Sequence, residues 1–559
     1  MTLPARHFYC TLGLLVSAVA FAQDEEFDYF SKNRELIRNG VQAVLQCNGL
    51  FTSHRTLDQV FDQELAYLRS ERFGGVVGNA SEGDYRVDEA NKLVTVGVAT
   101  GTPVSAVFRE GVGCVVSAPG QDLRRDDSLP ALTLPYPRFD PAQIDWPNGD
   151  RVTVTAHPES IDQDALQAAS DWAFERDTPE QDTISLLVVH KGDIVHERYA
   201  AGFDQTTRTR TWSTAKSIAV TLVGMLVDSR RLQLDASLGI DWEPELLAPE
   251  ADPRRAITLR HVLNMSSGLY PVDSFGMEYA TGSGLAYWAG ASSAQGMRHR
   301  GLVRDPGSYW DYENYDTLLA VYAMKRALKT QEAYSTFPRT ALFDKIGMRS
   351  TLVGMDRFGD FIFSSQVYTN ARDLARFGLL YLQDGVWDGQ RLLSSDWIRF
   401  VRTPAPATRS LGNFYGGQWW LVPDGVTDVP ADAYSAEGNR GQYVIVVPSH
   451  ELVIVRRGLE FGNQGVEAVQ RFHIHDELGI GRIRQLRLHR KIESRRSLAN
   501  ESTDALDAIV IQDPIFNQRK IAGNGLNASS LRRPVVNHQL KPCGTRKEGP
   551  VNPPKREYR

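Results

Sequence analysis

Apolar residues recur along the chain with two periods, and these periods predict its helices and strands. Residues 32–45 carry Leu, Ile and Val at the spacing of one helix face, and residues 92–98 alternate between apolar and polar for most of their length, as a strand does. Two apolar segments, 184–189 and 194–200, flank a Lys-Gly-Asp turn and predict a β-hairpin. Residues 443–455 predict a second hairpin.

Helical spacing dominates the sequence between the two hairpins. It predicts a helix directly after Ser213 and further helices at 315–329 and 371–383. Strands from both ends that meet in one sheet, with helices inserted between them, make an α+β fold.

The patterning divides the chain into four parts. We expect a targeting segment at 1–22, an N-terminal accessory unit at 23–157, a main domain at 158–485 and a basic, largely disordered tail at 486–559. The accessory unit includes a Pro-rich linker, residues 130–147, which lacks helical periodicity.

The first residues are typical of a secretory signal peptide. Arg6 and His7 precede the mostly apolar stretch Leu12–Phe21, and a small-x-small cleavage signal ends at Ala22. The apolar stretch is too short for a membrane span, which needs about 20 residues. We therefore expect a soluble protein that is periplasmic or secreted after cleavage.

Composition and charge narrow the class of protein. The chain has 559 residues, of which 42% are hydrophobic, and this excludes a wholly disordered chain, a collagen and a coiled coil. The formal net charge of −6 gives no reason to expect nucleic acid binding. Residues 481–559 hold 17 Lys and Arg against 7 Asp and Glu. Aromatic residues are nearly absent there, so a solvated tail is favoured over a nucleic-acid-binding arm.

The cysteines predict one disulfide. Four cysteines exclude a disulfide-dense scaffold and a Cys-rich zinc fold. After cleavage of the signal peptide, Cys47 and Cys114 form the natural pair within the accessory unit, and Cys543 remains in the tail. Three free thiols remain the alternative, because pairing does not follow from sequence alone.

Common hydrolase and metal signatures are missing from the sequence. It contains neither Gly-x-Ser-x-Gly nor His-Glu-x-x-His. His473, His475 and Asp476 resemble part of a zinc cluster, but the remaining ligands are absent. We expect no metal and no cofactor.

One tetrad suggests nucleophilic catalysis. Ser213 and Lys216 form a Ser-x-x-Lys at the start of an apolar helix, where residues three apart share a face. An amine within reach of a serine hydroxyl can accept its proton. The alternative is a serine that caps the helix and a lysine on the surface.

A Tyr-x-Asn follows the tetrad at two places. Tyr312 and Asn314 come after a Pro-Gly lead-in, 99 residues beyond Ser213, and Tyr368 and Asn370 come 155 residues beyond it. We favour Tyr312 because of its order and its lead-in. Tyr368 then becomes a residue at a helix entry, with Asn370 or Thr369 as the cap.

These elements, taken in order, resemble a known family. The chain is similar to serine hydrolases related to class C β-lactamases and D-alanyl-D-alanine carboxypeptidases, in the branch named for 6-aminohexanoate-dimer hydrolase and family VIII esterases. The similarity runs from about residue 183 to 458, through TWSTAKSIAVTLVGMLVDSRRLQLD, ITLRHVLNMSSGL, PGSYWDYEN, YTNARDLARFGLLYLQDG and GQYVIVVPSHELVIVRRG. The resemblance implies a β-lactamase/transpeptidase-like fold, with an antiparallel sheet flanked by helices, a helical subdomain and a small N-terminal α/β unit.

The resemblance also implies roles for residues. Ser213 would be the acylated nucleophile, Lys216 would take its proton, and Tyr312 would deliver a proton to the leaving group. Asn314 would orient the lysine or the substrate carbonyl. The backbone N–H groups of Ser213 and Asn439 would form the oxyanion hole, which needs only peptide donors.

The third element of the family, on the strand that edges the site, departs from the usual pattern. Residues 436–442 read Ala-Glu-Gly-Asn-Arg-Gly-Gln where Lys-Thr-Gly or His-Thr-Gly is usual. Glu437, Gly438 and Gln442 are expected beside the oxyanion donor at the substrate. The cation that would bind a carboxylate is missing, unless Arg440 replaces it in part.

The sequence therefore predicts an exported serine hydrolase that cleaves a small ester or simple amide. A β-lactamase or D-Ala-D-Ala carboxypeptidase is one alternative, and a catalytically inert sensor on the same fold is another. The oligomeric state and the role of residues 23–157 remain open at this point.

Overall fold

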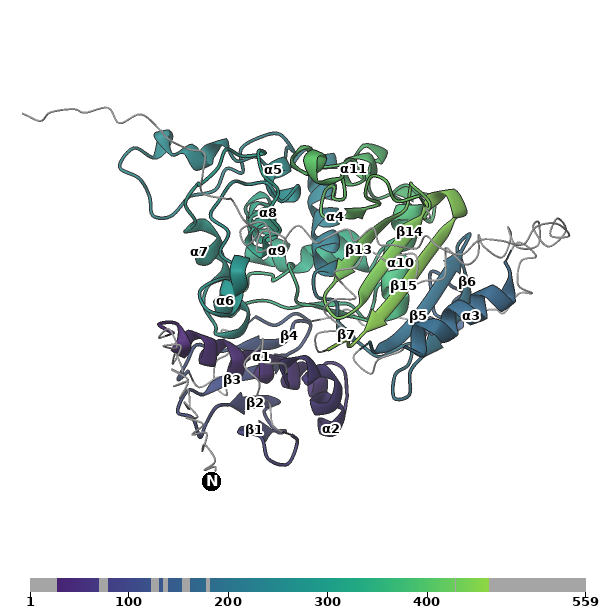
Figure 1. Ribbon diagram of the computed structural model, residues 1–559, viewed down its shortest axis with the longest axis horizontal. Coiled ribbons are helices and arrows are strands. Elements are labelled where there is room, and N and C mark those ends of the chain that lie inside the picture. The colour runs from purple at the N-terminus through teal and green to yellow at the C-terminus, as the bar shows by residue number, and fades with distance from the viewer. Residues whose placement is uncertain are drawn as a thin grey trace, which may run out of the picture. The chain divides into compact units, whose positions relative to one another are not determined.

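The structure, a computed structural model, describes residues 28–69, 79–121, 130–133, 139–152, 161–176, 181–427 and 429–461. All of them belong to one compact unit, residues 1–508 (Figure 1). The second unit, residues 509–559, lies outside the described residues. So do the predicted targeting segment, the basic tail, the His473–Asp476 stretch and Cys543.

A six-stranded antiparallel sheet forms the centre of the main domain. Its strands, in spatial order, are β12 (Trp420–Leu421), β13 (Tyr434–Gly438), β14 (Gln442–Val447), β15 (Leu452–Gly458), β5 (Thr183–His190) and β6 (Asp193–Tyr199). Because β15 pairs with β5, the two predicted hairpins join in one sheet, and the predicted α+β fold is confirmed.

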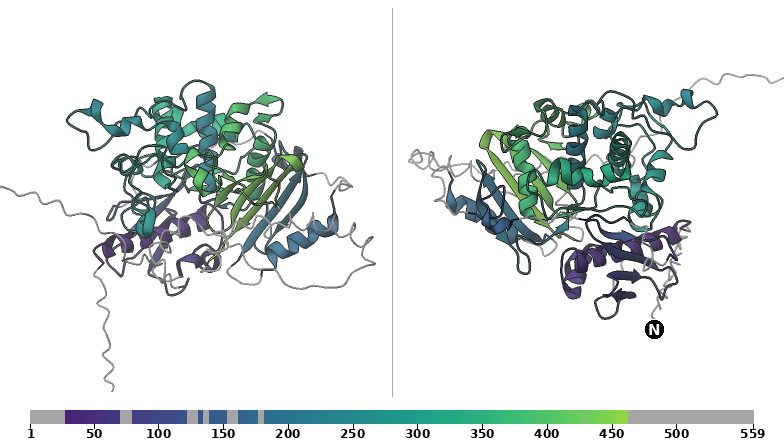
Figure 2. Two further views of the ribbon diagram at one scale, coloured as in Figure 1. Left: turned by 45° about the horizontal axis from the view of Figure 1, so that its top comes forward. Right: turned by 180° about the vertical axis from the view of Figure 1, so that it is seen from behind.

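Helices cover both faces of this sheet (Figures 1 and 2). The predicted helix after Ser213, α4 (Thr214–Asp228), and α10 (Ala371–Leu382) pack on one face, and α3 (Gln163–Phe174) packs on the other. Gly378 lets α10 approach closely, because a Cβ there would lie 2.4 Å from a methyl group of Val453.

A largely helical region lies between the two halves of the sheet in the sequence. Its helices are α5 (Leu259–Leu263), α6 (Gly284–Trp288), α7 (Ser293–Arg298), α8 (Asn314–Leu328), α9 (Gln331–Phe337) and α11 (Ser395–Val401). The same region holds two small sheets of short strands. One has the strand order β7 (Thr209–Arg210), β9 (Val367–Thr369), β8 (Leu352–Val353), and the other pairs β10 (Val386–Trp387) with β11 (Gln390–Arg391). The predicted helix at 315–329 corresponds to α8, which packs against α4, the helix that follows Ser213.

The N-terminal region is a small α/β unit. The helix α1 (Ser31–Phe51) packs on an antiparallel sheet of β1 (Tyr85–Asp88), β2 (Leu93–Val96), β3 (Val104–Arg109) and β4 (Gly113–Val116). Cys47 in α1 and Cys114 in β4 form a disulfide. The predicted strand at 92–98 ends at residue 96, because Gly97 has a φ of +82° and turns the chain.

Three short helical segments lead out of α1. They are α2 (Leu57–Gln59), the π-helix η1 (Val60–Glu64) and the 3₁₀-helix η2 (Ala66–Arg69). The contacts with the main domain come from α1, which contacts α6 (Figure 1), and from η1 and η2, through Glu64 and Tyr67.

Part of the predicted Pro-rich linker is anchored to the main domain. Trp146 donates its indole N–H to the carbonyl of Gly192 at 2.8 Å. Arg376 of α10 donates to the carbonyls of Pro147 and Gly149 and lies over the Trp146 ring. This stretch therefore has fixed contacts, although its sequence lacks helical periodicity.

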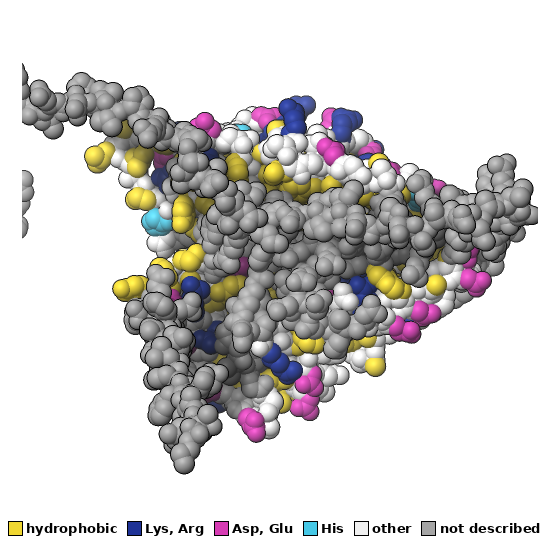
Figure 3. All heavy atoms as spheres, in the orientation of Figure 1, with side chains coloured by type: hydrophobic (Ala, Val, Ile, Leu, Met, Phe, Trp, Pro, Cys, Tyr) yellow, Lys and Arg dark blue, Asp and Glu magenta, His cyan; other side chains and the backbone are white. Residues whose placement is uncertain are grey.

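The surface carries charges of both signs. On the face shown in Figure 3, Lys and Arg side chains are interspersed with Asp and Glu among hydrophobic and uncharged groups. Among the described residues, none of the helices has the length and apolar character that crossing a membrane requires.

Candidate active site

Ser213 lies at the N-terminus of α4 and does not act as its cap. Its side-chain oxygen accepts no hydrogen bond from the N–H groups at the start of the helix. The preceding residue, Trp212, has a φ of +51°, in the left-handed region that non-glycine residues rarely adopt. Ser213 Oγ lies 3.1 Å from Lys216 Nζ, within hydrogen-bond distance, and Lys216 is only 1% exposed. A capping serine with a surface lysine is therefore not what the chain forms.

Lys216 is buried, and its environment favours the neutral amine. Burial lowers its pKa to about 7, although the carboxylates of Glu278, Asp273 and Glu313 act in the opposite direction. A large fraction of Lys216 is therefore unprotonated at neutral pH, as a base that accepts a proton from Ser213 must be.

The three hydrogen bonds of Lys216 also orient its lone pair. Besides Ser213 Oγ, Nζ contacts Asn314 Oδ1 at 2.7 Å and the Ser364 carbonyl at 2.9 Å. Both of these oxygens only accept hydrogen bonds, so a neutral amine must direct its two N–H groups to them. The lone pair then points to the Ser213 hydroxyl, which is the direction needed for proton transfer.

Tyr312 lies beside the same amine. Its ring centroid is 4.9 Å from Lys216 Nζ. Burial raises the pKa of Tyr312, a hydrogen bond to Ser213 acts against this, and the charges of Glu437 and Glu278 add to the rise. The phenol therefore stays protonated at neutral pH and can donate a proton near Ser213.

The other Tyr-x-Asn lies elsewhere. Tyr368 is in β9, where it pairs with Arg210 and Leu352, and Asn370 accepts from the Asp373 N–H at 2.8 Å as the N-cap of α10. Tyr312, and not Tyr368, therefore lies beside Lys216, and its catalytic role stays a prediction.

Asn314 is held in one orientation by its own partners. It is the first residue of α8, and its amide nitrogen donates to Asp273 Oδ2 at 2.9 Å and to Ser283 Oγ at 3.2 Å. Ser283 in turn donates to Asp273 from both its backbone N–H and its hydroxyl. This network turns the Asn314 oxygen to Lys216.

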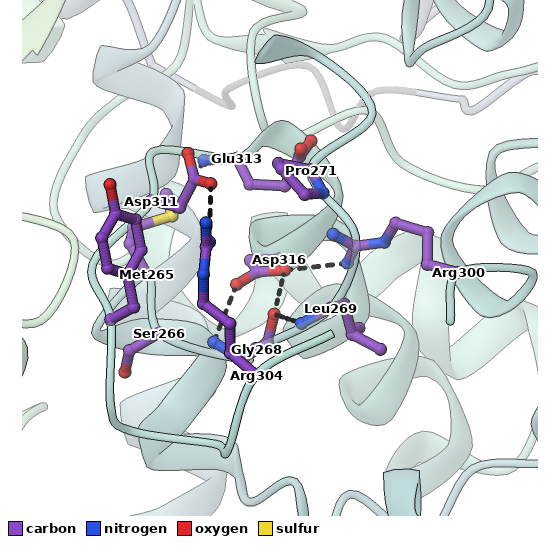
Figure 4. Close-up of a pocket in the computed structure, with 12 residues that line it drawn as sticks. Met265, Ser266, Gly268, Leu269, Pro271, Arg300, Arg304, Asp311, Glu313 and Asp316 are labelled. Atoms are coloured by element: carbon purple, nitrogen blue, oxygen red, sulfur yellow. Dashed lines mark hydrogen bonds and ion pairs between the residues drawn. The ribbon is translucent and has the colours of Figure 1, made fainter. Parts of the chain in front are cut away.

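A small polar pocket adjoins this network (Figure 4). Two buried acidic residues line it, Glu313 at the N-cap of α8 and Asp316 within α8, and Arg300 donates to Asp316 Oδ1 at 2.8 Å. Burial and the nearby Asp273 raise the pKa of Glu313 well above its usual value. The pocket is lined by neither Ser213 nor Lys216, so it is separate from the reacting hydroxyl.

The end of β13 lies against the backbone at Ser213. A Cβ on Gly438 would lie 2.2 Å from the Thr211 carbonyl and 3.1 Å from the Ser213 nitrogen, so only glycine fits there. Asn439 follows in the turn to β14, and its side-chain oxygen accepts from the Arg440 N–H at 2.8 Å. The backbone after Gly438 is thus brought close to the Ser213 N–H.

Glu437, and not Ala436, is the residue of the third element that faces the site. Ala436 is fully buried in the core, and strand alternation places Glu437 on the opposite face together with Ser435, which donates to it at 2.5 Å. The charge of Glu437 raises the pKa of Tyr312, so its carboxylate acts within the site.

Arg440 and Gln442 have structural roles. Arg440 is buried and donates to the carbonyls of Glu460, Glu64, Gln63 and Leu459 at 2.6–2.7 Å. Gln442 is also buried, donates to the carbonyls of Arg440 and Gly458, and accepts from Arg457. The expectation that Gln442 faces the substrate is therefore wrong, and so is that of Arg440 as a substitute cation, because both side chains hold the turn between β13 and β14.

Several residues of the site were missed from the sequence. Glu278 lies in the 3₁₀-helix η8 (Ser274–Tyr279), and Asp273 is the N-cap of this helix. Ser364 contributes only a carbonyl to Lys216, and no motif marked any of the three residues. An aromatic cluster next to Tyr312 was also missed; its members are Trp310, Phe414, Tyr415 and Trp420. The aromatic residues around 310 and 415–420 were the one signal for it.

The geometry agrees with comparisons with known proteins. The family model "Beta-lactamase" matches residues 173–456, about half of the chain. A 6-aminohexanoate-dimer hydrolase of Paenarthrobacter ureafaciens is 26% identical over 294 residues, which cover 49% of this chain and 72% of that enzyme.

Solved structures are similar to the same part of the chain. One from Bacillus anthracis, named for 6-aminohexanoate-dimer hydrolase, is 19% identical with a TM-score of 0.44, and the match covers 56% of this chain and 80% of that one. A family VIII carboxylesterase is 15% identical with a TM-score of 0.42, and the match covers 54% of this chain and 92% of that one.

Proposed function

The chain belongs to the beta-lactamase family and is a serine hydrolase, and from this premise we propose that it cleaves esters or simple amides through an acyl-enzyme on Ser213. The observation that carries the proposal is the contact of 3.1 Å between Ser213 Oγ and a buried lysine whose pKa is about 7.

In the first half of the reaction, Ser213 Oγ attacks the substrate carbonyl and its proton passes to neutral Lys216. The backbone N–H groups of Ser213 and Asn439 stabilise the negative charge on the carbonyl oxygen. Tyr312 donates its proton to the leaving alcohol or amine and is reprotonated by Lys216. In the second half, water attacks the acyl-enzyme with the same groups as base and acid.

The preferred substrate is uncharged near the reacting carbonyl. A β-lactam or an acyl-D-Ala-D-Ala peptide carries a carboxylate, and in this chain Ala-Glu-Gly, residues 436–438, stands where the family usually has Lys-Thr-Gly. The cation is therefore missing, and the charge of Glu437 repels the carboxylate. Loss of a hydrogen bond to a charged group costs about 1.5–3 kcal/mol, which corresponds to roughly ten- to a hundredfold in affinity. Neutral short-chain esters lose nothing by this exchange.

The test combines active-site labelling with a substrate panel. The wild-type protein should bind a fluorophosphonate covalently and hydrolyse p-nitrophenyl esters, with a higher kcat/KM than for penicillins or acyl-D-Ala-D-Ala peptides. Ser213→Ala should lose both properties. Ser229→Ala, at the far end of α4, is the matched control, because its hydroxyl contacts only the helix carbonyls of Met225 and Leu226.

The outcomes separate the alternatives. A preference for a β-lactam or a D-Ala-D-Ala peptide would replace the esterase by a β-lactamase or peptidase. No labelling and no turnover in folded protein would favour an inert sensor. Activity in folded Ser213→Ala would end the mechanism.

We also propose that the protein is exported to the periplasm or secreted. The signal-peptide pattern of residues 1–22 supports this, and the Cys47–Cys114 disulfide suits an oxidising compartment. Mass spectrometry of the protein from a culture fractionated by compartment should find a mature N-terminus at Gln23. An intact N-terminus on cytoplasmic protein would contradict export.

A further inference from the structure

Two residues that flank the reacting groups are in contact with the N-terminal unit. Trp212 immediately precedes Ser213, and Arg440 immediately follows Asn439. Both have a positive φ, +51° for Trp212 and +61° for Arg440. Non-glycine residues keep such a conformation only where their surroundings hold it.

The surroundings of Trp212 include the N-terminal unit. The Tyr67 ring meets the Trp212 ring edge-on, with centroids 5.4 Å apart and the planes at 90°. The guanidinium of Arg210 lies 3.7 Å from the centroid of the same indole. Tyr67 and Trp212 are both buried, so this contact is part of a packed core.

Arg440 is held by the same segment. It donates to the carbonyls of Gln63 and Glu64 at 2.7 Å each, and its guanidinium lies 4.9 Å from the centroid of the Tyr67 ring. Glu64 is itself fixed by an ion pair with buried Arg55 at 2.9 Å. Three residues of the segment 63–67 thus contact the neighbours of the two backbone donors: Gln63, Glu64 and Tyr67.

From these contacts we infer that the N-terminal unit completes the active site: Tyr67, with the carbonyls of Gln63 and Glu64, positions the two backbone N–H groups of the oxyanion hole through Trp212 and Arg440. The inference rests on the proposed function, because it assumes that Ser213 and Asn439 supply those donors. Tyr67 and Arg440 are positioning residues and do not touch the substrate. Residues 28–121 are then a part of the enzyme and not a separate module.

The physical reason lies in the geometry that an oxyanion hole requires. Two N–H groups from different elements must converge on one oxygen, and a donor that misses it loses most of its effect. Here the donors come from the start of α4 and from the turn after β13, and Tyr67 bridges the residues next to them. Displacement of about 1 Å in such a site costs on the order of a hundredfold in rate.

The test substitutes Tyr67 and measures acylation. Tyr67→Ala should slow fluorophosphonate labelling and lower kcat for a neutral p-nitrophenyl ester by about ten- to a hundredfold, with KM changed less than threefold. Tyr67→Phe keeps the ring and should stay within about twofold of the wild type. Phe108→Ala is the matched control, since it removes a ring from the same unit whose aromatic partner is Phe51.

The outcomes distinguish this inference from the proposed function. A folded Tyr67→Ala protein with the wild-type labelling rate would overturn the inference and leave the function intact. Equal losses in Tyr67→Ala and Phe108→Ala would show a general loss of stability and would also overturn it. Wild-type protein that is not labelled would instead contradict the function. If Tyr67→Ala does not fold, Arg440→Lys is the second variant, because a lysine cannot bond four carbonyls at once; its kcat should fall in the same way, and unchanged kcat would refute the inference.

Discussion

The two Tyr-x-Asn stretches of this chain have the same pattern and different surroundings. Tyr312 lies against the amine of Lys216, and Asn314 accepts a hydrogen bond from that amine. Tyr368 is a strand residue, and Asn370 caps a helix. Burial raises the pKa of both phenols, that of Tyr368 to about 12, so titration does not separate them. What separates them is the nearby lysine.

In the proposed mechanism, the catalytic role therefore depends on the location of a Tyr-x-Asn and not on the tripeptide itself. At the first stretch, α8 packs on α4, which brings an amide oxygen and a phenol to the nucleophile. At the second, Tyr368 is a paired residue of β9 and Asn370 accepts from the Asp373 N–H of α10. Variants at the two stretches should therefore differ in activity, and those with the greatest expected loss come first.

Removal of Lys216 should have the largest effect, because its amine is the group that separates the first Tyr-x-Asn stretch from the second. Lys216→Ala should lower kcat/KM for a neutral ester by roughly 10³-fold or more, as is usual when the base of a nucleophile is lost. Thermal unfolding should confirm that the variant is folded. Activity close to the wild type in folded protein would contradict the assignment of the base.

Removal of each phenol hydroxyl compares the two tyrosines directly. Tyr312→Phe should lower kcat by about 10²-fold or more, the range for a proton-transfer group. Tyr368→Phe should remain within about twofold of the wild type, since its hydroxyl makes only a 3.4 Å contact with Gln366. Steady-state kinetics on the same ester measure both, and the reverse order of losses would exchange the two roles.

Glu437 acts on the first stretch, and its substitution should change substrate preference. Glu437→Lys should raise kcat/KM for penicillins relative to neutral esters by roughly ten- to a hundredfold, because it removes a repulsion and adds a charged donor. Ala436→Lys should instead destabilise the protein, because Ala436 is in the core. An unchanged ratio of penicillin to ester turnover in Glu437→Lys would show that residue 437 does not contact the substrate carboxylate.

The pH profile should report Lys216. Burial lowers its pKa to about 7, and only the neutral amine accepts the Ser213 proton. As pH falls through 7 the amine becomes protonated, so kcat/KM should fall, approaching tenfold per pH unit in the acid limb. Activity of the wild type on a neutral ester between pH 5 and 9 checks this, and a flat profile below pH 7 would contradict a neutral lysine base.

The smallest effect should come from the helix cap of the second stretch. Asn370→Ala removes the acceptor for the Asp373 N–H and should cost about 0.5–2 kcal/mol of stability with little change in kcat. Asn314→Ala should instead lower kcat clearly, because it removes the amide oxygen that accepts a hydrogen bond from Lys216. Denaturant unfolding and ester kinetics on both variants measure the contrast, which disappears if Asn370 also serves catalysis.

The sequence alone determined the elements that depend on local spacing. Apolar periods located both hairpins, α8 and α10, and the spacing of three residues brought Ser213 and Lys216 onto one helix face. The order of motifs along the chain was enough to choose Tyr312 over Tyr368. The register of the third element was not settled by sequence, because strand alternation assigns faces only once one residue is known to be buried.

Only the tertiary structure decided which contacts form between segments that are far apart in the chain. Ser364 bonds Lys216 through its carbonyl, and the charges of Asp273 and Glu278 act on the same amine. The side chains of Arg440 and Gln442 are taken up by hydrogen bonds to backbone carbonyls. The place of Tyr67 beside Trp212 and Arg440 likewise has no sequence signature. The physical reason is that hydrogen bonds and burial depend on distances in space, and periodicity reports only the faces of single helices and strands.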